Sequence, residues 1–154
     1  MPESTIQEAG SSEPIVITRS IAHSRDRVFE AWTSPQLFAQ WFGTTEIPVP
    51  LETVSMDVRE GGEWRATMVI PDGPRIDWTG EFVVIDRPNH LSLTLTDQPG
   101  EAPGAPLTVD FIASEGGTEM TMTQHSPDFG PEQREQTIEG WNSFFTDLER
   151  VLSA

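Results

Sequence analysis

The sequence predicts an α+β fold in which a curved antiparallel sheet of about seven strands surrounds a long C-terminal helix, with two short helices after the first strand. Between residues 53 and 124, apolar and polar residues alternate in six consecutive runs, as in strands with one buried face. Residues 131–152 instead space their apolar side chains three and four apart, as a helix does. The chain of 154 residues is long enough to build one core of this kind.

The N-terminal 13 residues contain three glutamates and no basic residue. Such a segment buries too little apolar surface to fold, so we expect a disordered acidic tail over residues 1–13 and a single domain over residues 14–154. The first residues lack the basic and apolar regions of a signal peptide, and no apolar run approaches the roughly 20 residues of a membrane span. A cytoplasmic location without a membrane partner is therefore expected.

The first strand is expected over residues 15–21, and two short helices follow it. Ser24 is suited to cap the first helix because its hydroxyl can accept a hydrogen bond from an amide of the first turn. Ser34 would cap the second helix, with Pro35 at its first position, where a missing amide costs nothing. Gly43 is expected to end this helix.

The alternating runs are separated by turn-forming residues such as Gly61-Gly62 and Pro71-Asp72-Gly73. Side chains two residues apart share a face of a strand, so each run predicts which residues point inward. The closing helix is about 30 Å long, enough to cross the sheet and cover that inward face. The helix would present Ile138, Trp141, Phe145, Leu148 and Leu152 to the sheet.

Several local motifs occur in the same order as these elements. They are Arg19-Ser20-Ile21, Val28-Phe29-Glu30-Ala31-Trp32, Gln40-Trp41-Phe42-Gly43, Asp57-Val58-Arg59-Glu60-Gly61-Gly62-Glu63-Trp64, Asp72-Gly73, Gly80-Glu81-Phe82, Gly117-Thr118-Glu119-Met120-Thr121-Met122 and Glu139-Gly140-Trp141. Over about residues 15–152 this arrangement resembles the START-like, or SRPBCC, superfamily. Within it, the motifs look like the branch named after the activator of the heat-shock chaperone's ATPase.

The resemblance implies a helix-grip fold, in which the sheet grips the last helix. It also implies a cavity between sheet and helix, in which members of the superfamily bind apolar or amphipathic small molecules. Some members are cyclases or hydratases, and the eukaryotic namesake of the branch contacts a chaperone. Function therefore has to be argued from the site rather than from the fold.

The composition narrows the classes of partner. Nine arginines, no lysine and 25 acidic residues give a net charge of −16, which repels nucleic-acid backbones and anionic lipid surfaces. The chain has no cysteine, and its three histidines lack ligand partners at metal spacing. No nucleophile elbow or phosphate-binding loop is present. We therefore expect no nucleic-acid partner, metal or cofactor.

Side-chain parity predicts a ligand site built from inward-facing aromatic residues and methionines. The predicted lining residues are Trp41, Trp64, Met68, Trp78, Phe82, Phe111, Met120, Met122, Trp141 and Phe145. For most of them, an ordinary packed core is the alternative that the pattern favours. Trp64, Trp78 and Trp141 are the strongest candidates because buried indoles need partners for their N–H groups, and Gly80 and Ala66 leave space between the tryptophans.

Few polar residues share the inward parity, and most charged residues on the strands are predicted to face outward. Glu60 and Asp97 are candidates for a polar rim, although their positions favour the alternative that both are turn residues in solvent. Gln124 could offer a hydrogen bond inside the cavity or be a satisfied core residue. No catalytic residue is predicted.

Three hypotheses follow from these features. The first is a carrier or sensor that binds a small apolar, aromatic or amphipathic molecule without chemistry. The second is a protein-interaction module, such as a chaperone ATPase regulator or a homodimer, that uses outward-facing Val69, Val83, Ile85 and Ile112. The third is a cyclase- or hydratase-type enzyme that uses Glu60, Asp97 or an ordered water.

Overall fold

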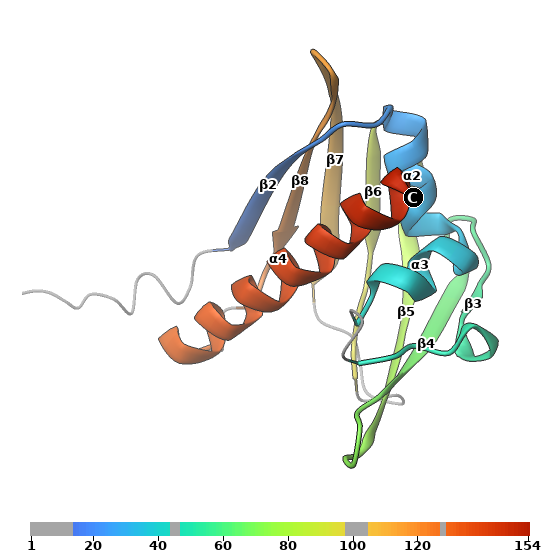
Figure 1. The fold of residues 1–154 in the computed structure, drawn as a ribbon, viewed down its shortest axis with the longest axis vertical. Coiled ribbons are helices and arrows are strands. Elements are labelled where there is room, and N and C mark those ends of the chain that lie inside the picture. The colour runs from blue at the N-terminus through green and yellow to red at the C-terminus, as the bar shows by residue number, and fades with distance from the viewer. Residues whose placement is uncertain (1–13, 44–46, 98–104, 127–128) are drawn as a thin grey trace, which may run out of the picture.

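The computed structural model of the chain describes residues 14–43, 47–97, 105–126 and 129–154 (Figure 1). The expected tail over residues 1–13 lies outside the described residues. The elements are β2 (Ile15–Ile21), α2 (Arg25–Thr33), α3 (Pro35–Trp41), the 3-10 helix η1 (Leu51–Thr53), β3 (Ser55–Met56), β4 (Glu63–Val69), β5 (Arg75–Asp86), β6 (His90–Leu93), β7 (Leu107–Ser114), β8 (Gly117–Gln124) and α4 (Pro131–Ser153).

The seven strands form one antiparallel sheet in the order β2-β8-β7-β6-β5-β4-β3. Helix α4 lies across one face of the sheet, and its C-terminal half contacts α2 and α3 (Figure 1). This arrangement is the helix-grip fold, so the predicted fold class is confirmed. No helix in the described ranges is both long and apolar enough to cross a membrane.

The two short helices begin as expected, but their caps differ. The Ser24 hydroxyl accepts a hydrogen bond from the Arg27 amide at 3.3 Å, whereas Ser34 makes no such bond and its hydroxyl donates to the side chain of Gln36. Helix α3 has its proline in the first turn and ends at Trp41, just before Gly43. Gly43 has a φ of 107°, a conformation that favours glycine.

Two strands differ from the alternation pattern. Strand β3 is only two residues long. In β5 the pairing register shifts between Phe82 and Val84, so Ile85 lies opposite the fully buried Leu91 and packs against the core. Ile85 was expected to face outward, and the bulge reverses that expectation because one extra residue changes which side chains point inward.

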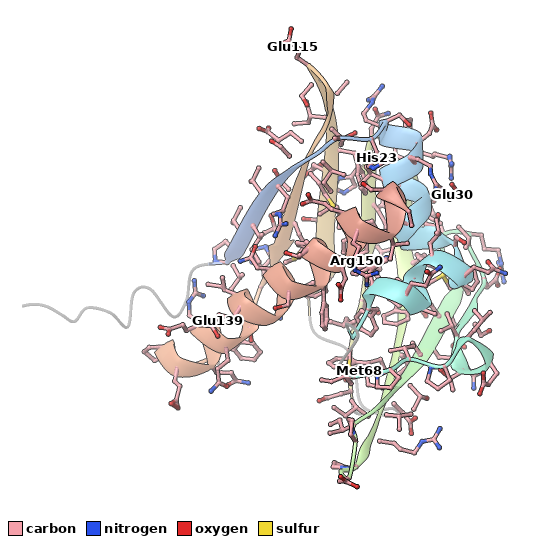
Figure 2. All side chains as sticks on the ribbon, in the orientation of Figure 1. His23, Glu30, Met68, Glu115, Glu139 and Arg150 are labelled. Atoms are coloured by element: carbon pink, nitrogen blue, oxygen red, sulfur yellow. The ribbon has the colours of Figure 1, made fainter. Side chains whose placement is uncertain are left out.

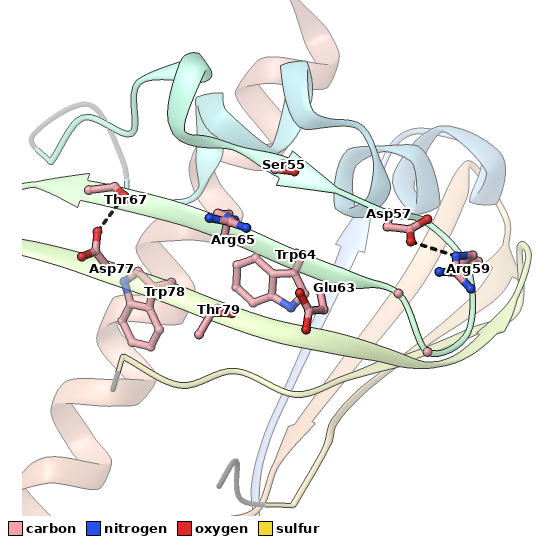
Figure 3. A pocket seen from close by; sticks show the side chains of 12 residues that line it. Ser55, Asp57, Arg59, Glu63, Trp64, Arg65, Thr67, Asp77, Trp78 and Thr79 are labelled. Atoms are coloured by element: carbon pink, nitrogen blue, oxygen red, sulfur yellow. Dashed lines mark hydrogen bonds and ion pairs between the residues drawn. The ribbon is translucent and has the colours of Figure 1, made fainter. Parts of the chain in front are cut away.

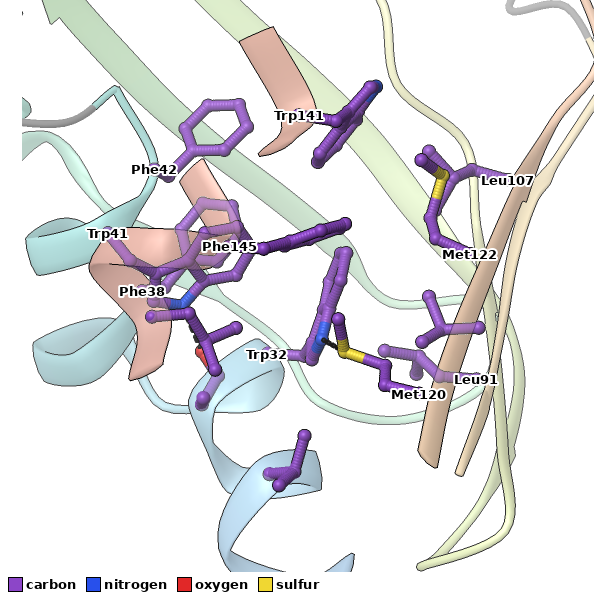
Figure 4. Close-up of a cluster of buried hydrophobic side chains, with 14 of the residues drawn as sticks. Trp32, Phe38, Trp41, Phe42, Leu91, Leu107, Met120, Met122, Trp141 and Phe145 are labelled. Carbon is purple, nitrogen blue, oxygen red and sulfur yellow. Dashed lines mark hydrogen bonds between the residues drawn. The ribbon is translucent and has the colours of Figure 1, made fainter. Parts of the chain in front are cut away.

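The C-terminal half of α4 packs against a dense aromatic core (Figure 4). Trp32 of α2 lies 4.9 Å from Trp41 and 6.0 Å from Phe145, measured between ring centroids. The Trp32 indole also donates a hydrogen bond to the sulfur of Met120 on β8 at 3.4 Å. Residues from two short helices therefore fill the centre of the space between sheet and α4.

Arg19 ties the edge strand β2 to α4. Its guanidinium donates to the Glu149 carboxylate at 2.7 and 3.1 Å, to the backbone oxygen of Asn142 at 3.2 Å and to the Thr146 hydroxyl at 3.3 Å. Because these partners lie along two turns of the helix, Arg19 fixes α4 over one edge of the sheet.

Candidate ligand-binding pocket

A pocket of about 610 Å³ opens between the sheet and the N-terminal half of α4. It is lined by Phe42, Trp78, Leu95, Thr96, Asp97, Gln124, Ser126, Phe129, Gln133, Thr137, Gly140, Trp141 and Phe144. The volume falls within the range of ordinary small-molecule sites. Aromatic side chains form much of the wall, and polar side chains from three segments of the chain are mixed with them.

The pocket occurs where α4 is not packed against the sheet. The buried residues of α4 begin at Trp141 and continue to Leu152, whereas Thr137 and Ile138 are only half-buried. Helices α2 and α3 contact α4 and supply the aromatic filling described above, but the N-terminal turns of α4 lie beyond them (Figure 1). This half of the helix therefore covers a space that no described core side chain fills.

The deep wall of the pocket is held in place by ring contacts and indole hydrogen bonds. Phe42 lies 5.9 Å from Trp78 and 5.4 Å from Phe144, so it joins the sheet side of the pocket to the helix side. The Trp78 indole donates to the Met68 sulfur at 3.1 Å. Trp141 packs 5.5 Å from Phe145, which anchors it to the core.

The polar side chains that line the pocket differ in how many hydrogen bonds they already make within the protein. Gln124 accepts a hydrogen bond from the Trp141 indole at 2.8 Å and donates to the Ser126 hydroxyl at 2.9 Å. Its amide is thus used to orient Trp141 and the pocket rim. Asp97 is exposed and lines the pocket just beyond the Thr79–Thr96 bridge. It is the one ionisable side chain among the described lining residues.

Glu60, the third predicted rim residue, lies elsewhere. It is exposed, and its carboxylate accepts a hydrogen bond from the Ile85 amide at 3.1 Å, beside the bulge in β5. Glu60 thus satisfies a backbone group at the register shift. The structure brings Asp97 and Gln124 to the pocket and leaves Glu60 outside it.

Of the ten predicted lining residues, the structure brings Trp78 and Trp141 to this pocket. The remaining eight are buried in the packed core: Trp41, Trp64, Met68, Phe82, Phe111, Met120, Met122 and Phe145. Strand alternation and helical spacing identified their inward direction correctly, because each is at most 4% exposed. The sequence pattern could not distinguish a side chain packed in the core from one that lines a pocket.

The space expected beside Gly80 is already occupied. The Trp64 indole lies across Gly80 and donates to the Thr94 carbonyl at 3.0 Å. A methyl group on Gly80 would overlap that carbonyl and the Trp64 ring nitrogen. Trp64 also contacts Phe38 and Phe42, whose ring centroids are 5.5 and 6.0 Å from its own.

The sequence pattern did not identify most of the lining residues that lie outside the alternating strands. Phe42 falls at the end of the second predicted short helix, and Phe144 is not among the residues of the last helix that the spacing directed at the sheet. Leu95 lies at the end of its run, and Phe129 falls between elements, where no periodicity exists. Gly140 carried a usable signal, because a glycine inside a helix removes side-chain volume from one side.

A second hollow, of about 870 Å³, lies on the outer face of β4 and β5 (Figure 3). Some of its polar side chains bond to one another, in the Thr67–Asp77 hydrogen bond at 2.8 Å and the Arg59–Asp57 ion pair at 2.8 Å. Most residues that line this hollow are polar or charged, and Trp64 and Trp78 are its only aromatic lining residues among those described. We favour the smaller pocket as the ligand site because it combines apolar walls with a few polar groups.

The described residues bring together little that could perform acid–base or metal chemistry. No three His, Asp or Glu side chains gather in a metal-binding arrangement in the described ranges. His90 does pair with Asp110 at 2.7 Å, but on strands β6 and β7 rather than at the pocket.

A curved sheet around a long helix, with an apolar pocket under that helix, defines a helix-grip domain of the START-like class. The chain belongs to the family described as "Activator of Hsp90 ATPase homolog 1-like protein", whose model matches residues 22–153. No curated protein matches the sequence.

Several solved structures share the fold. An AHSA1-like protein from Aeromonas hydrophila is 24% identical, with a TM-score of 0.76, and the match covers 91% of this chain and 92% of that one. A protein from Nitrosomonas europaea is 23% identical, with a TM-score of 0.76 and coverage of 92% and 95%. A protein from Chromobacterium violaceum is 18% identical, with a TM-score of 0.77 and coverage of 92% and 98%.

Proposed function

We propose that this protein binds a small apolar or amphipathic molecule in the pocket under the N-terminal half of α4, as a carrier or sensor that performs no chemistry on it. The observation that carries the proposal is the composition of the pocket wall. Trp78, Trp141, Phe42, Phe129 and Phe144 offer large apolar surfaces, and hydroxyl and amide groups lie between them. Such a wall suits a ligand that buries a ring or chain and leaves a polar end at the rim.

The ionisable groups favour binding over catalysis. General acid–base catalysis places an ionisable side chain within hydrogen-bond reach of the reacting group, and two groups usually divide the acid and base roles. Asp97 alone among the described lining residues can ionise, and it lies at the exposed rim. The Gln124 amide is already used to hold Trp141.

A role as a protein-interaction module has less support from this structure. The exposed large hydrophobic residues each lie on a different segment of the chain: Val16, Leu51, Val58, Val83 and Ile112. A docking surface requires such residues to be contiguous, whereas Val16 and Ile112 each pair with a polar residue of β8, Thr123 and Glu119. Val69 and Ile85, which were expected to extend an outer patch, are partly buried.

Binding can be tested with the uncharged dye N-phenylnaphthylamine, whose fluorescence rises in apolar surroundings. We expect the dye to saturate one site on the wild-type protein. The Gly140→Leu variant should abolish this signal or weaken the affinity at least tenfold, because Gly140 lines the pocket and a side chain built there meets open space.

Gln136→Leu is the matched control, since it adds leucine to an exposed position of the same helix that does not line the pocket. This variant should bind the dye as the wild type does. Thermal unfolding of both variants establishes that they are folded. Equal dye binding by folded Gly140→Leu and wild-type protein would contradict the proposal, as would the absence of any saturable binding to the wild type.

A further inference from the structure

The pocket has an asymmetric charge environment. Asp97 supplies a carboxylate, and no arginine or histidine is among the described residues that line the pocket. The basic residues nearest in sequence, His125 and Arg134, are not lining residues. A ligand carboxylate or phosphate would therefore meet the Asp97 carboxylate, and no cationic side chain among the described lining residues offsets the repulsion.

The net charge of the helix segment that covers the pocket has the same sign as Asp97. Residues 131–140, which form the N-terminal half of α4, carry three glutamates and one arginine. Glu139 projects from this half of the helix (Figure 2). The whole chain has a net charge of −16, so the field over the pocket favours the approach of cations and opposes the approach of anions.

The walls favour the same sign of charge. The faces of tryptophan and phenylalanine rings carry partial negative charge, and an ammonium group within about 6 Å of a ring centre is attracted to it. Trp78, Trp141 and Phe129 come to the pocket from a strand, a helix and the segment that precedes the helix. A positively charged group in this pocket therefore has aromatic rings and the Asp97 carboxylate among the residues around it.

We propose that the pocket selects cationic amphiphiles, meaning molecules with an apolar ring or chain and a positively charged amine, and that Asp97 is the residue that determines this selectivity. This inference rests on the proposed function, because it names the class of ligand for the same site. Anionic amphiphiles such as fatty acids are disfavoured by the same groups.

The test uses three probes that share one apolar ring system and differ in charge at neutral pH: naphthylmethylamine, naphthylmethanol and naphthoate. We expect the amine to bind about two- to fivefold more tightly than the alcohol, the effect typical of one partly exposed charge pair, and naphthoate to bind more weakly than both. High salt should reduce the difference between amine and alcohol, because it screens exposed charges.

Asp97→Asn should remove the preference for the amine, and Asp97→Glu should retain it. Glu115→Gln is the matched control, since it also removes one negative charge but at the far tip of the β7–β8 hairpin (Figure 2). This variant should keep the preference. Equal affinity of the wild type for amine and alcohol would overturn the inference, as would a preference for the amine that survives in Asp97→Asn.

The two proposals fail in different ways. If naphthylmethanol and the uncharged dye both fail to bind the wild-type protein, the binding function itself is refuted. If both bind, and naphthylmethylamine binds no more tightly than naphthylmethanol, the pocket is a binding site without selectivity for cations.

Discussion

Gly80 shows how one residue decides whether space beneath the sheet is filled or open. Its lack of a side chain lets the Trp64 indole cross β5 and reach the Thr94 carbonyl. From the sequence alone, the same glycine predicts an open space that a ligand could occupy. The difference arises because parity gives the direction of a side chain but not the volume that its neighbours take up.

We therefore expect Gly80→Ala to lower the free energy of unfolding by about 1–3 kcal/mol, the usual cost of adding a methylene-sized group to a packed core. Gly140→Ala is the control, because its methyl group meets open space within a helix, and it should raise stability by roughly 0.5–1 kcal/mol. Urea unfolding of both variants checks this. A Gly80→Ala variant as stable as the wild type would show that Trp64 does not occupy this position.

At the scale of elements, the two halves of α4 differ in how closely they pack against the rest of the protein. Its C-terminal half is buried against α2 and α3, and Arg19 holds its middle to β2. Its N-terminal half has no comparable packing, which leaves the pocket. A change that loosens the Arg19 contacts should therefore loosen the element that covers the candidate site.

A double-mutant cycle with Arg19→Met and Glu149→Gln measures this connection. The two side chains are 24% and 36% exposed, so we expect a coupling of about 0.5–1 kcal/mol, smaller at 1 M salt. The Arg27–Glu30 pair, with both side chains more than 40% exposed, is the control and should give a smaller value. Equal coupling in the two pairs would mean that Arg19 contributes nothing specific to the placement of α4.

Most elements could be predicted from the sequence because alternation and helical spacing are local signals. Strand β2 has the predicted bounds, and α4 begins at the predicted proline. The bulge in β5 could not be predicted, because Val83, Val84 and Ile85 are all apolar and the phase of the alternation disappears there. A register shift needs a partner strand, which the local pattern does not contain.

At the scale of the whole molecule, the pocket position depends on residues that are distant in sequence. The parity of the strands placed candidate lining residues over the whole inward face. Trp32 and Phe38 come from the two short helices and fill the central part of that space. How far these side chains reach is a property of three-dimensional packing, so the sequence could indicate a gripped helix but not which half of it stays unpacked.

The five tryptophans provide the most direct test, since each indole N–H has its own partner and gives its own signal in a ¹H–¹⁵N NMR spectrum. Titration with naphthylmethanol should shift the indole signals of Trp78 and Trp141, which line the pocket. The signals of Trp32, Trp41 and Trp64 should stay in place, because these rings are in the filled core. Shifts confined to the core tryptophans, or no indole shift at saturating ligand, would contradict a binding site under the N-terminal half of α4.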